Sequence, residues 1–270
     1  MSAPSSRPPS VLTIAGSDSG GGAGIQADLK TFAAHDIHGL SAIAALTAQH
    51  TRGVTAVHAP PVAFLQAQID ACFDDFDIRA VKIGMLATAD IVRAVADALD
   101  AHPDVPVVLD PVMIATSGAK LLDDDALDAL RTRLIPRAAV LTPNIPEAEL
   151  LLGRTIVDAA SAEAALDALR ALGARGVLLK GGHLDEGDTV VDRYADPETH
   201  FTHRAPRLAV DGHGTGCTLS SAIAARIAGG ASAAEACNAA IAYVHAAMRA
   251  AYRPGRSDIS VLGHLAPRIR

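Results

Sequence analysis

Residues 211–218 have the composition of an anion-binding loop. Glycines stand at positions 212, 214 and 216, and the apolar helical run 219–223 follows directly. Closely spaced glycines let successive backbone N–H groups point in one direction, and a helix N-terminus attracts negative charge. We therefore expect residues 214–218 to form an anion hole for the charge on a transferring phosphoryl group. The simpler alternative is that Thr218 serves only as the N-cap of the helix.

Another glycine cluster lies near the N-terminus, where five glycines fall within residues 16–24. Residues 22–27 fit the dinucleotide-binding pattern G-x-G-x-x-A, but that pattern needs an acidic residue about 20 positions later. No Asp or Glu occurs between Asp36 and Asp70, so a Rossmann oxidoreductase is disfavoured. The P-loop pattern GxxxxGK[ST] is absent from the sequence as well. The cluster is interpreted as a turn that binds a ligand, with a plain flexible turn as the alternative.

Three oxygen-bearing side chains follow predicted strands. Asn144 and Glu147 are three residues apart, so on the first turn of a helix they would face the same side. Asp110 ends another apolar run and is a candidate for the same site. Amide and carboxylate oxygens suit a hydrated Mg²⁺, although N-x-x-E is also a common capping pattern. We expect this group at the exposed mouth of a strand, where Glu147 would tolerate a neutral replacement.

The elements that position these residues alternate between apolar strands and Ala-rich helical patterns. The sequence predicts strands at 11–17, 41–47, 80–85, 105–111, 139–142 and 176–180. It predicts helices at 23–35, 62–73, 89–100, 123–134, 146–152 and 161–172. A hairpin at 189–195 and 200–208 and helices at 215–228 and 233–251 complete the pattern. Such an order predicts an α/β fold, a three-layer α/β/α sandwich around a mostly parallel sheet, with ligands at the carboxyl ends of the strands.

Composition excludes several classes of function. The formal net charge is −7, and the 23 Lys and Arg residues are scattered, which argues against nucleic-acid binding and against attraction to an anionic membrane. No apolar run is long enough to span a bilayer. The three cysteines fit neither a disulfide framework nor a zinc site, so a reducing cytoplasm is the expected setting. Residues 1–10 are expected to be a disordered tail, and 11–270 a single domain.

Taken together, these pieces resemble the hydroxymethylpyrimidine/phosphomethylpyrimidine kinases of thiamine biosynthesis, in the ribokinase-like superfamily. The resemblance covers about residues 11–250. It rests on the order and spacing of segments 13–18, 21–30, 45–50, 82–86, 109–118, 141–149, 179–183 and 213–220. It implies a ribokinase-like sandwich that uses ATP and Mg²⁺ to phosphorylate 4-amino-5-hydroxymethyl-2-methylpyrimidine twice, first at its hydroxymethyl oxygen and then at the new phosphate. Residues 253–270 are only loosely similar to the closing segment of the family.

The resemblance also implies which residues bind the pyrimidine. Gly16, Ala23, Asp28, Gln49 and Met85 match the pyrimidine pocket of the family. Gln49 has an independent rationale, because it follows an apolar strand, where an unpaired amide would be costly. A primary amide can donate to a ring nitrogen and accept from the neighbouring amino group of an aminopyrimidine.

The remaining matches concern the nucleotide, the metal and catalysis. Asn144 and Glu147 match the magnesium motif, while Lys180, Thr215 and Asn144 are assigned to the nucleotide. Lys180 is also assigned to catalysis. Gly214, Gly216 and Cys217, also assigned to catalysis, match the anion hole and the position of the catalytic base. Related enzymes commonly have Asp where this chain has Cys217, and we expect the helix N-terminus to lower the thiol pKa. Lys82, on a strand that is expected to be buried, is interpreted as a structural ion-pair partner.

Two other functions remain open. A pyridoxal or pyridoxine kinase of the same fold would also phosphorylate a hydroxymethylated nitrogen ring, although Met85 and Gln49 favour the pyrimidine. A non-catalytic sensor of a thiamine precursor would explain the pocket, but not the anion hole, the Asn144/Glu147 pair and Lys180 together. The family resemblance further suggests a homodimer.

Overall fold

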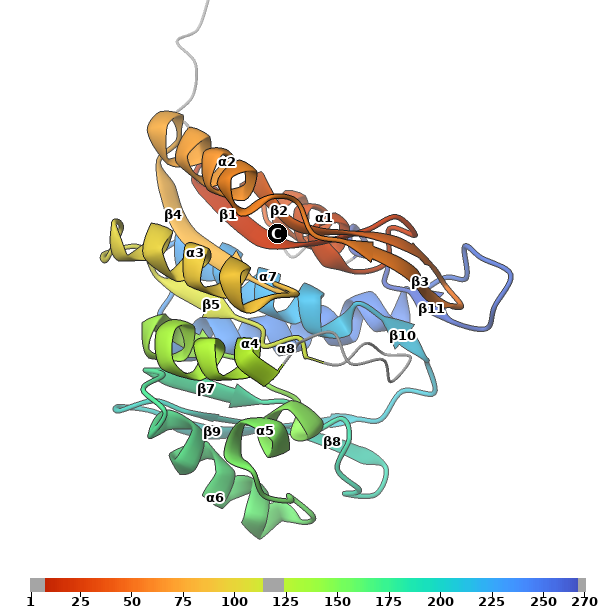
Figure 1. The fold of residues 1–270 in the computed structure, drawn as a ribbon. Helices are drawn as coiled ribbons and strands as arrows, with labels where there is room; N and C mark the ends of the chain where they lie inside the picture. The colour runs from red at the N-terminus through yellow and green to blue at the C-terminus, as the bar shows by residue number, and fades with distance from the viewer. Residues whose placement is uncertain (1–7, 114–123, 267–270) are drawn as a thin grey trace, which may run out of the picture.

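A nine-stranded sheet forms the centre of the molecule, and helices cover both of its faces (Figure 1). This computed structural model describes residues 8–113 and 124–266. The spatial order of the strands is β3-β2-β1-β4-β5-β6-β7-β8-β9. Their bounds are β1 Ser10–Asp18, β2 His38–His50, β3 Gly53–His58, β4 Ile78–Ile83, β5 Val107–Leu109, β6 Ala138–Leu141, β7 Gly176–Leu179, β8 Thr189–Ala195 and β9 His200–Pro206.

The middle of the sheet is parallel and its edges are antiparallel. Strands β2, β1, β4, β5, β6 and β7 pair in parallel, whereas β3 pairs antiparallel with β2, and β8 and β9 form an antiparallel hairpin beside β7. Parallel strands need crossover connections, which the intervening helices provide. The predicted α/β class and mostly parallel sheet are confirmed.

The helices form two outer layers (Figure 1). Helices on one face are α2 Val62–Asp75, α3 Ala89–Asp100, α4 Asp124–Ala129, α5 Ile145–Leu152 and α6 Ala159–Arg170. Those on the other face are α1 Gly24–Ala34, α7 Thr215–Ala228 and α8 Ala233–Arg249. The three-layer architecture expected from the sequence is therefore present.

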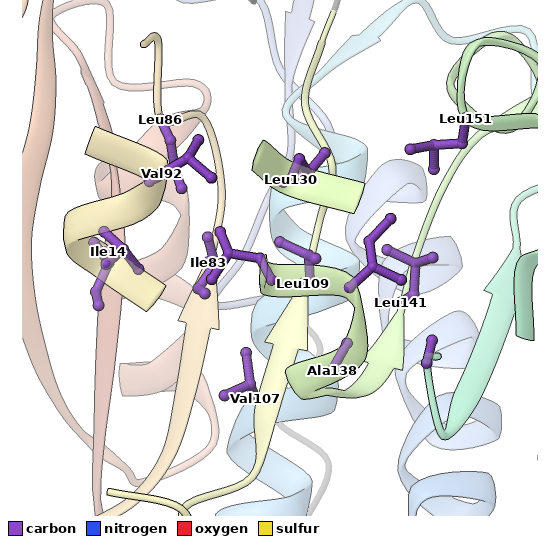
Figure 2. Packing of buried hydrophobic residues seen from close by; sticks show 14 of the residues in the cluster. Ile14, Ile83, Leu86, Val92, Val107, Leu109, Leu130, Ala138, Leu141 and Leu151 are labelled. Atoms are coloured by element: carbon purple, nitrogen blue, oxygen red, sulfur yellow. The ribbon is translucent and has the colours of Figure 1, made fainter. Parts of the chain in front are cut away.

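Each face of the sheet has its own apolar core. Ile14, Ile83, Leu109 and Leu141 come from four neighbouring strands and lie in the core under α3 and α4 (Figure 2). Because successive residues of a strand point to opposite faces, the neighbour Val108 belongs to the other core. Strands buried on both faces read as continuous apolar runs, which is why the sequence revealed them.

Predicted and observed boundaries differ most where the sequence carries little periodicity. Strand β3 was not predicted, because four of its six side chains are exposed and no apolar alternation marks it. The helix expected at 123–134 changes after α4 into a π-helical turn at Leu130–Leu134 and a 3₁₀ turn at Ile135–Arg137; position 123 lies outside the described residues. Strand β1 begins at Ser10, within the expected tail; residues 1–7 are also outside the described part.

A separate two-stranded sheet joins the C-terminal segment to the glycine cluster before α7. Strands β10 (Gly212–His213) and β11 (Ser260–Val261) pair in parallel, with His213 opposite Val261. The sequence did not predict them, because strands of two residues show no period. Among residues 8–113 and 124–266, no helix is long and apolar enough to cross a bilayer.

Candidate active site

A cavity of about 750 Å³ lies at the carboxyl ends of the parallel strands. Each predicted site residue except Asp28 lines it, and the set consists of Gly16, Ala23, Gln49, Met85, Asp110, Asn144, Glu147, Lys180, Gly214, Thr215, Gly216 and Cys217. They come from the last residues of β1 and β2, from the loops after β1, β4, β5, β6 and β7, and from the starts of α5 and α7. Parallel strands place all these loops on one edge of the sheet, so residues up to 200 positions apart meet there.

The second glycine cluster forms an open helix N-terminus. Gly214 is the N-cap of α7, has the left-handed φ of 84° and receives no side-chain cap among the described residues. A Cβ atom at this position would collide with the carbonyl oxygen of Gly22, so the site requires glycine. Thr218 is not the N-cap; its hydroxyl donates to the Gly214 carbonyl at 2.8 Å. The first N–H groups of α7 are therefore available to an anion in the cavity.

Cys217 lies on the first turn of α7, in the cavity wall, but its thiol is not activated in the way the sequence suggested. Burial raises the pKa of Cys217 to about 11, and the neighbouring ammonium of Lys82 only partly opposes this effect. The expectation of a lowered thiol pKa is wrong for this structure. Desolvation of the thiolate outweighs the helix N-terminus and the nearby cation.

Lys180 joins the two carboxylates that were predicted to bind metal. Its Nζ lies 2.9 Å from Oδ1 of Asp110 and 3.7 Å from Oε2 of Glu147. Burial would lower the pKa of Lys180, but the two carboxylates outweigh it and raise that pKa. Lys180 therefore stays protonated. Gly216 is close by, because a Cβ there would lie 3.0 Å from Lys180 Nζ.

Asn144 and Glu147 form a capping box at the start of α5. Asn144 Oδ1 accepts from the Glu147 N–H, and Glu147 Oε2 accepts from the Asn144 N–H, both at 2.8 Å. Glu147 is 3% exposed, so the expected exposed position is wrong. Burial raises the pKa of Glu147 to about 7, since Asp110 adds to this effect and Lys180 only partly offsets it.

The donor set fits a hydrated divalent cation. Both carboxylates lie within 4.0 Å of one ammonium nitrogen, so a single cation can approach both. Among the described residues, no group of three His, Cys, Asp or Glu side chains could enclose a metal. Mg²⁺ commonly keeps several waters and binds one or two carboxylates together with substrate phosphates, which matches this pair.

Gln49 lies near the end of β2 and belongs to a polar group in the cavity wall. Its Oε1 accepts from the Thr47 hydroxyl at 3.0 Å, and its Nε2 lies 2.9 Å from Nε2 of His213. His213 Nε2 also lies 3.3 Å from Oδ2 of Asp18. The Gln49 amide is thus held in place by residues from β2 and from the second glycine cluster.

Sequence reasoning missed Asp18 and His213 as site residues. The Asp18 carboxylate accepts from the N–H groups of Gly20, Gly22 and Ala23 and thereby shapes the first glycine cluster. Burial would raise the pKa of Asp18, but His213 and these N–H groups outweigh it and lower that pKa. The available signal was position: Asp18 ends a strand at the ligand-binding edge, and His213 lies between glycines 212 and 214.

Small residues and Met85 form the remaining wall near Gln49. A Cβ at Gly16 would lie 2.9 Å from the Met85 methyl group, so Met85 packs directly on the backbone there. Ala23 lines the cavity just before α1. Ala23 and Met85 thus give this part of the wall apolar side chains.

Asp28 does not line the cavity, and its predicted contact with the substrate is not supported by its position. Its carboxylate is fully buried and accepts from Thr13, Lys82 and Ser221 at 2.7–3.0 Å. Lys82 is fully buried as well, which matches its expected role as a structural ion-pair partner. Asp28 faces inward because residue 28 is on the side of α1 that packs against the sheet.

Comparisons with known proteins agree with this geometry. Residues 18–262 match the family model described as phosphomethylpyrimidine kinase. A hydroxymethylpyrimidine/phosphomethylpyrimidine kinase from Rhizobium meliloti is 51% identical over 244 residues, which cover 90% of this chain and 91% of the relative.

Two solved structures also resemble the chain. A phosphomethylpyrimidine kinase from Clostridium difficile is 42% identical with a TM-score of 0.79, covering 88% of this chain and 98% of that one. An ADP complex of Bacillus subtilis pyridoxal kinase is 33% identical with a TM-score of 0.90, covering 98% of this chain and 100% of that one. By its sequence and its fold, the chain belongs to the phosphomethylpyrimidine kinase family.

Proposed function

We propose that this protein transfers phosphoryl groups from ATP to 4-amino-5-hydroxymethyl-2-methylpyrimidine and then to the resulting monophosphate. The observation that carries the proposal is a single cavity that contains an open helix N-terminus, a protonated lysine with two carboxylates, and an anchored primary amide. Phosphoryl transfer needs positioning and charge stabilisation more than covalent catalysis, and these groups supply both.

The two substrates occupy different parts of this cavity. The pyrimidine lies against Met85, Gly16 and Ala23, where the Gln49 amide bonds the ring nitrogen and the amino group. The nucleotide phosphates lie near Lys180 and Thr215, on the side where Asn144 begins α5. The α7 N-terminus lies between the two, where the transferred phosphoryl group passes.

In the first transfer, the hydroxymethyl oxygen attacks the γ-phosphorus, the bond to the β-phosphate oxygen breaks, and the hydroxyl proton leaves. Cys217 is the side chain on the first turn of α7 that would accept this proton as a thiolate. N–H groups of Gly214 and Gly216 stabilise charge on the equatorial oxygens. Lys180 holds the departing phosphate, which leaves as ADP.

The second transfer differs in its acceptor. A phosphate oxygen of the monophosphate attacks, and a phosphate monoester is largely ionised near neutral pH because its second pKa is about 6. This step needs no base. Glu147 and Asp110, with Asn144 beside them, would hold a hydrated Mg²⁺, which would supply positive charge opposite the phosphates.

Mass spectrometry of the products tests the proposal directly. The purified protein is incubated with ATP, Mg²⁺ and the pyrimidine, and one and then two added phosphates are expected. Pyridoxal is supplied in a parallel reaction, because a pyridoxal kinase structure aligns with 98% of this chain. Faster phosphorylation of pyridoxal would reassign the substrate, and binding without phosphorylation of either compound would identify a sensor.

The remaining proposals concern the whole protein. We place it in the cytoplasm as a single kinase domain over residues 11–270 that forms a homodimer. Light scattering on the eluted protein should give twice the mass of 27.6 kDa. A mass of one chain at micromolar concentration would rule out the stable dimer.

A further inference from the structure

The C-terminal residues 260–264 pack against both glycine clusters at once. Strand β11 pairs with β10, and its Ser260 N–H donates to the Asp211 carbonyl at 2.9 Å (Figure 1). Gly22 of the first cluster lies against this pair, because a Cβ there would be 3.0 Å from Val261 Cγ2 and 2.9 Å from His213 Cδ2. The segment thus covers the place where the two clusters touch.

His264 connects this segment to the first turn of α7. Its Nε2 lies 3.0 Å from the Thr218 hydroxyl, which in turn donates to the Gly214 carbonyl at 2.8 Å. The Thr218 N–H donates to the same carbonyl at 2.9 Å. Gly214 is the residue whose left-handed conformation opens the helix N-terminus. A continuous chain of contacts therefore connects the C-terminal segment to the Gly214 carbonyl, whose peptide group sets the direction of the first N–H groups of α7.

The position of His264 is itself fixed from several sides. The residue is 4% exposed, and its carbonyl accepts from the buried Tyr243 hydroxyl of α8 at 2.8 Å. Lys30 of α1 adds a positive charge nearby, and its Nζ donates to the Gly21 carbonyl. Burial and then Lys30 lower the pKa of His264 to about 4, so the ring is neutral at physiological pH. A rigid, uncharged ring can hold a hydroxyl in one orientation.

We propose that His264 is a positioning residue for phosphoryl transfer, because it holds Thr218, and through it Gly214, in the geometry that opens the N-terminus of α7 to the transferring group. His264 does not line the cavity, so it acts through Thr218. The proposal rests on the role of this helix N-terminus as the anion hole. Small displacements of such groups weaken transition-state binding more than substrate binding.

Four variants test the proposal by steady-state kinetics with both substrates. His264→Ala should lower kcat about tenfold while the KM values for pyrimidine and ATP stay within about twofold. Thr218→Val keeps the shape of the side chain but removes its hydroxyl, and it should lower kcat similarly. Combining the two should cost no more than either alone, because both remove the same contact. His264→Gln offers an amide to Thr218 and should restore most of kcat.

Ile69→Val is the control for destabilisation alone. Ile69 is buried in α2 on the other face of the sheet, and its truncation should lower the midpoint of thermal unfolding by about 2–4 °C without altering kcat. Thermal unfolding of each variant shows whether it is folded at the assay temperature. If His264→Ala does not fold, Thr218→Val and His264→Gln carry the test.

Hydrogen exchange of the amides in residues 214–218 distinguishes the positioning role of His264 from the role of these residues as the anion hole. Faster exchange together with a lower kcat in Thr218→Val supports the proposal. Faster exchange with an unchanged kcat would show that the contact orders these residues but that they are not the anion hole. Unchanged exchange and unchanged kcat would overturn the positioning role of His264 while leaving the anion hole intact. A rise in KM alone would overturn it too.

Discussion

Among single residues, Gln49 carries the proposed recognition of the pyrimidine. Its amide is held by Thr47 and lies 2.9 Å from His213, so it faces the cavity in a defined orientation. An anchored amide loses little conformational freedom when a ligand binds, which favours a strong and specific contact.

Gln49→Ala should raise the pyrimidine KM without an equal change in the ATP KM. Loss of neutral hydrogen bonds in a pocket costs about 1–3 kcal/mol, which is roughly 5- to 150-fold. Gln66→Ala is a matched control, because the Gln66 amide donates to the exposed Asp70 on α2, away from the cavity. Equal increases in both KM values would contradict a role in pyrimidine recognition.

Glu147→Gln should raise the Mg²⁺ concentration needed for half-maximal turnover, because a neutral amide binds a hydrated cation less tightly than a carboxylate. The carbonyl oxygen of Gln can still accept from the Asn144 N–H, so the helix cap is retained. Glu235→Gln controls for the cap, since Glu235 occupies the same position of the Ser232 capping box on α8. Identical Mg²⁺ activation curves in mutant and parent would remove Glu147 from the metal site.

Cys217 provides a test that depends on pH. With its pKa raised to about 11, only about one thiol in 10⁴ is ionised at pH 7. If the thiolate takes the hydroxyl proton, the first transfer should accelerate about tenfold per pH unit between pH 7 and 9.5, because the active form is the deprotonated one. The second transfer, measured from the monophosphate, should lack this slope.

Cys217→Ala should remove the slope and lower the first transfer by about 10²-fold or more, with a smaller effect on the second. Lys180 stays protonated across this range, so it does not contribute the slope. Equal losses in both transfers would mean that Cys217 only shapes the anion hole.

At the scale of secondary-structure elements, the Asp28–Lys82 pair joins α1, α7 and the strands beneath the active site. Both side chains are 0% exposed and 3.0 Å apart, and Ser221 of α7 and Thr13 of β1 also donate to Asp28. A buried carboxylate that loses its cation is strongly destabilising, even where the intact pair contributes little.

Lys82→Met should therefore reduce the free energy of unfolding by about 3–5 kcal/mol, measured by urea denaturation. Arg79→Met is the control on the same strand, because Arg79 is 60% exposed and pairs with the exposed Asp77. Its loss should cost no more than about 1 kcal/mol. Similar losses in the free energy of unfolding for both variants would show that the buried pair does not stabilise this region more than an exposed pair does.

At the scale of the whole molecule, His264 makes stability depend on pH. Its pKa of about 4 in the folded protein is below the ordinary value of 6.5, so the unfolded chain binds this proton first. The neutral ring thus stabilises the fold above about pH 6.5, and this contribution is lost as the pH falls toward 4.

The free energy of unfolding of the parent should therefore fall relative to that of His264→Gln by about 3 kcal/mol between pH 6.5 and 4. Comparing the two proteins at each pH cancels the contribution that their shared carboxylates make to the free energy of unfolding. A constant difference across this range would mean that the ring is not buried in its neutral form.

Most of the secondary structure, the fold class and the family could be predicted from local patterns in the sequence. Burial on both faces made the strands β1, β4 and β7 recognisable as continuous apolar runs. The helices α3 and α7 were recognisable from the spacing of their apolar residues. The cavity was also foreseen in outline, since the ends of parallel strands must share one edge. The glycines at 214 and 216 indicated a helix N-terminus without a side-chain cap, which α7 has among the described residues; its role as an anion hole stays a prediction.

The burial of individual side chains and their bonding partners could not be predicted in this way, because they depend on how the elements pack. Asp28 turned inward to Lys82, Glu147 was buried, and the thiol pKa of Cys217 rose, because desolvation depends on atoms brought in from distant parts of the chain. The pairing of β10 with β11 and the contact of His264 with Thr218 join residues 46 or more positions apart. No local pattern encodes such contacts, since they arise only when both partners are already held by the packed sheet and helices.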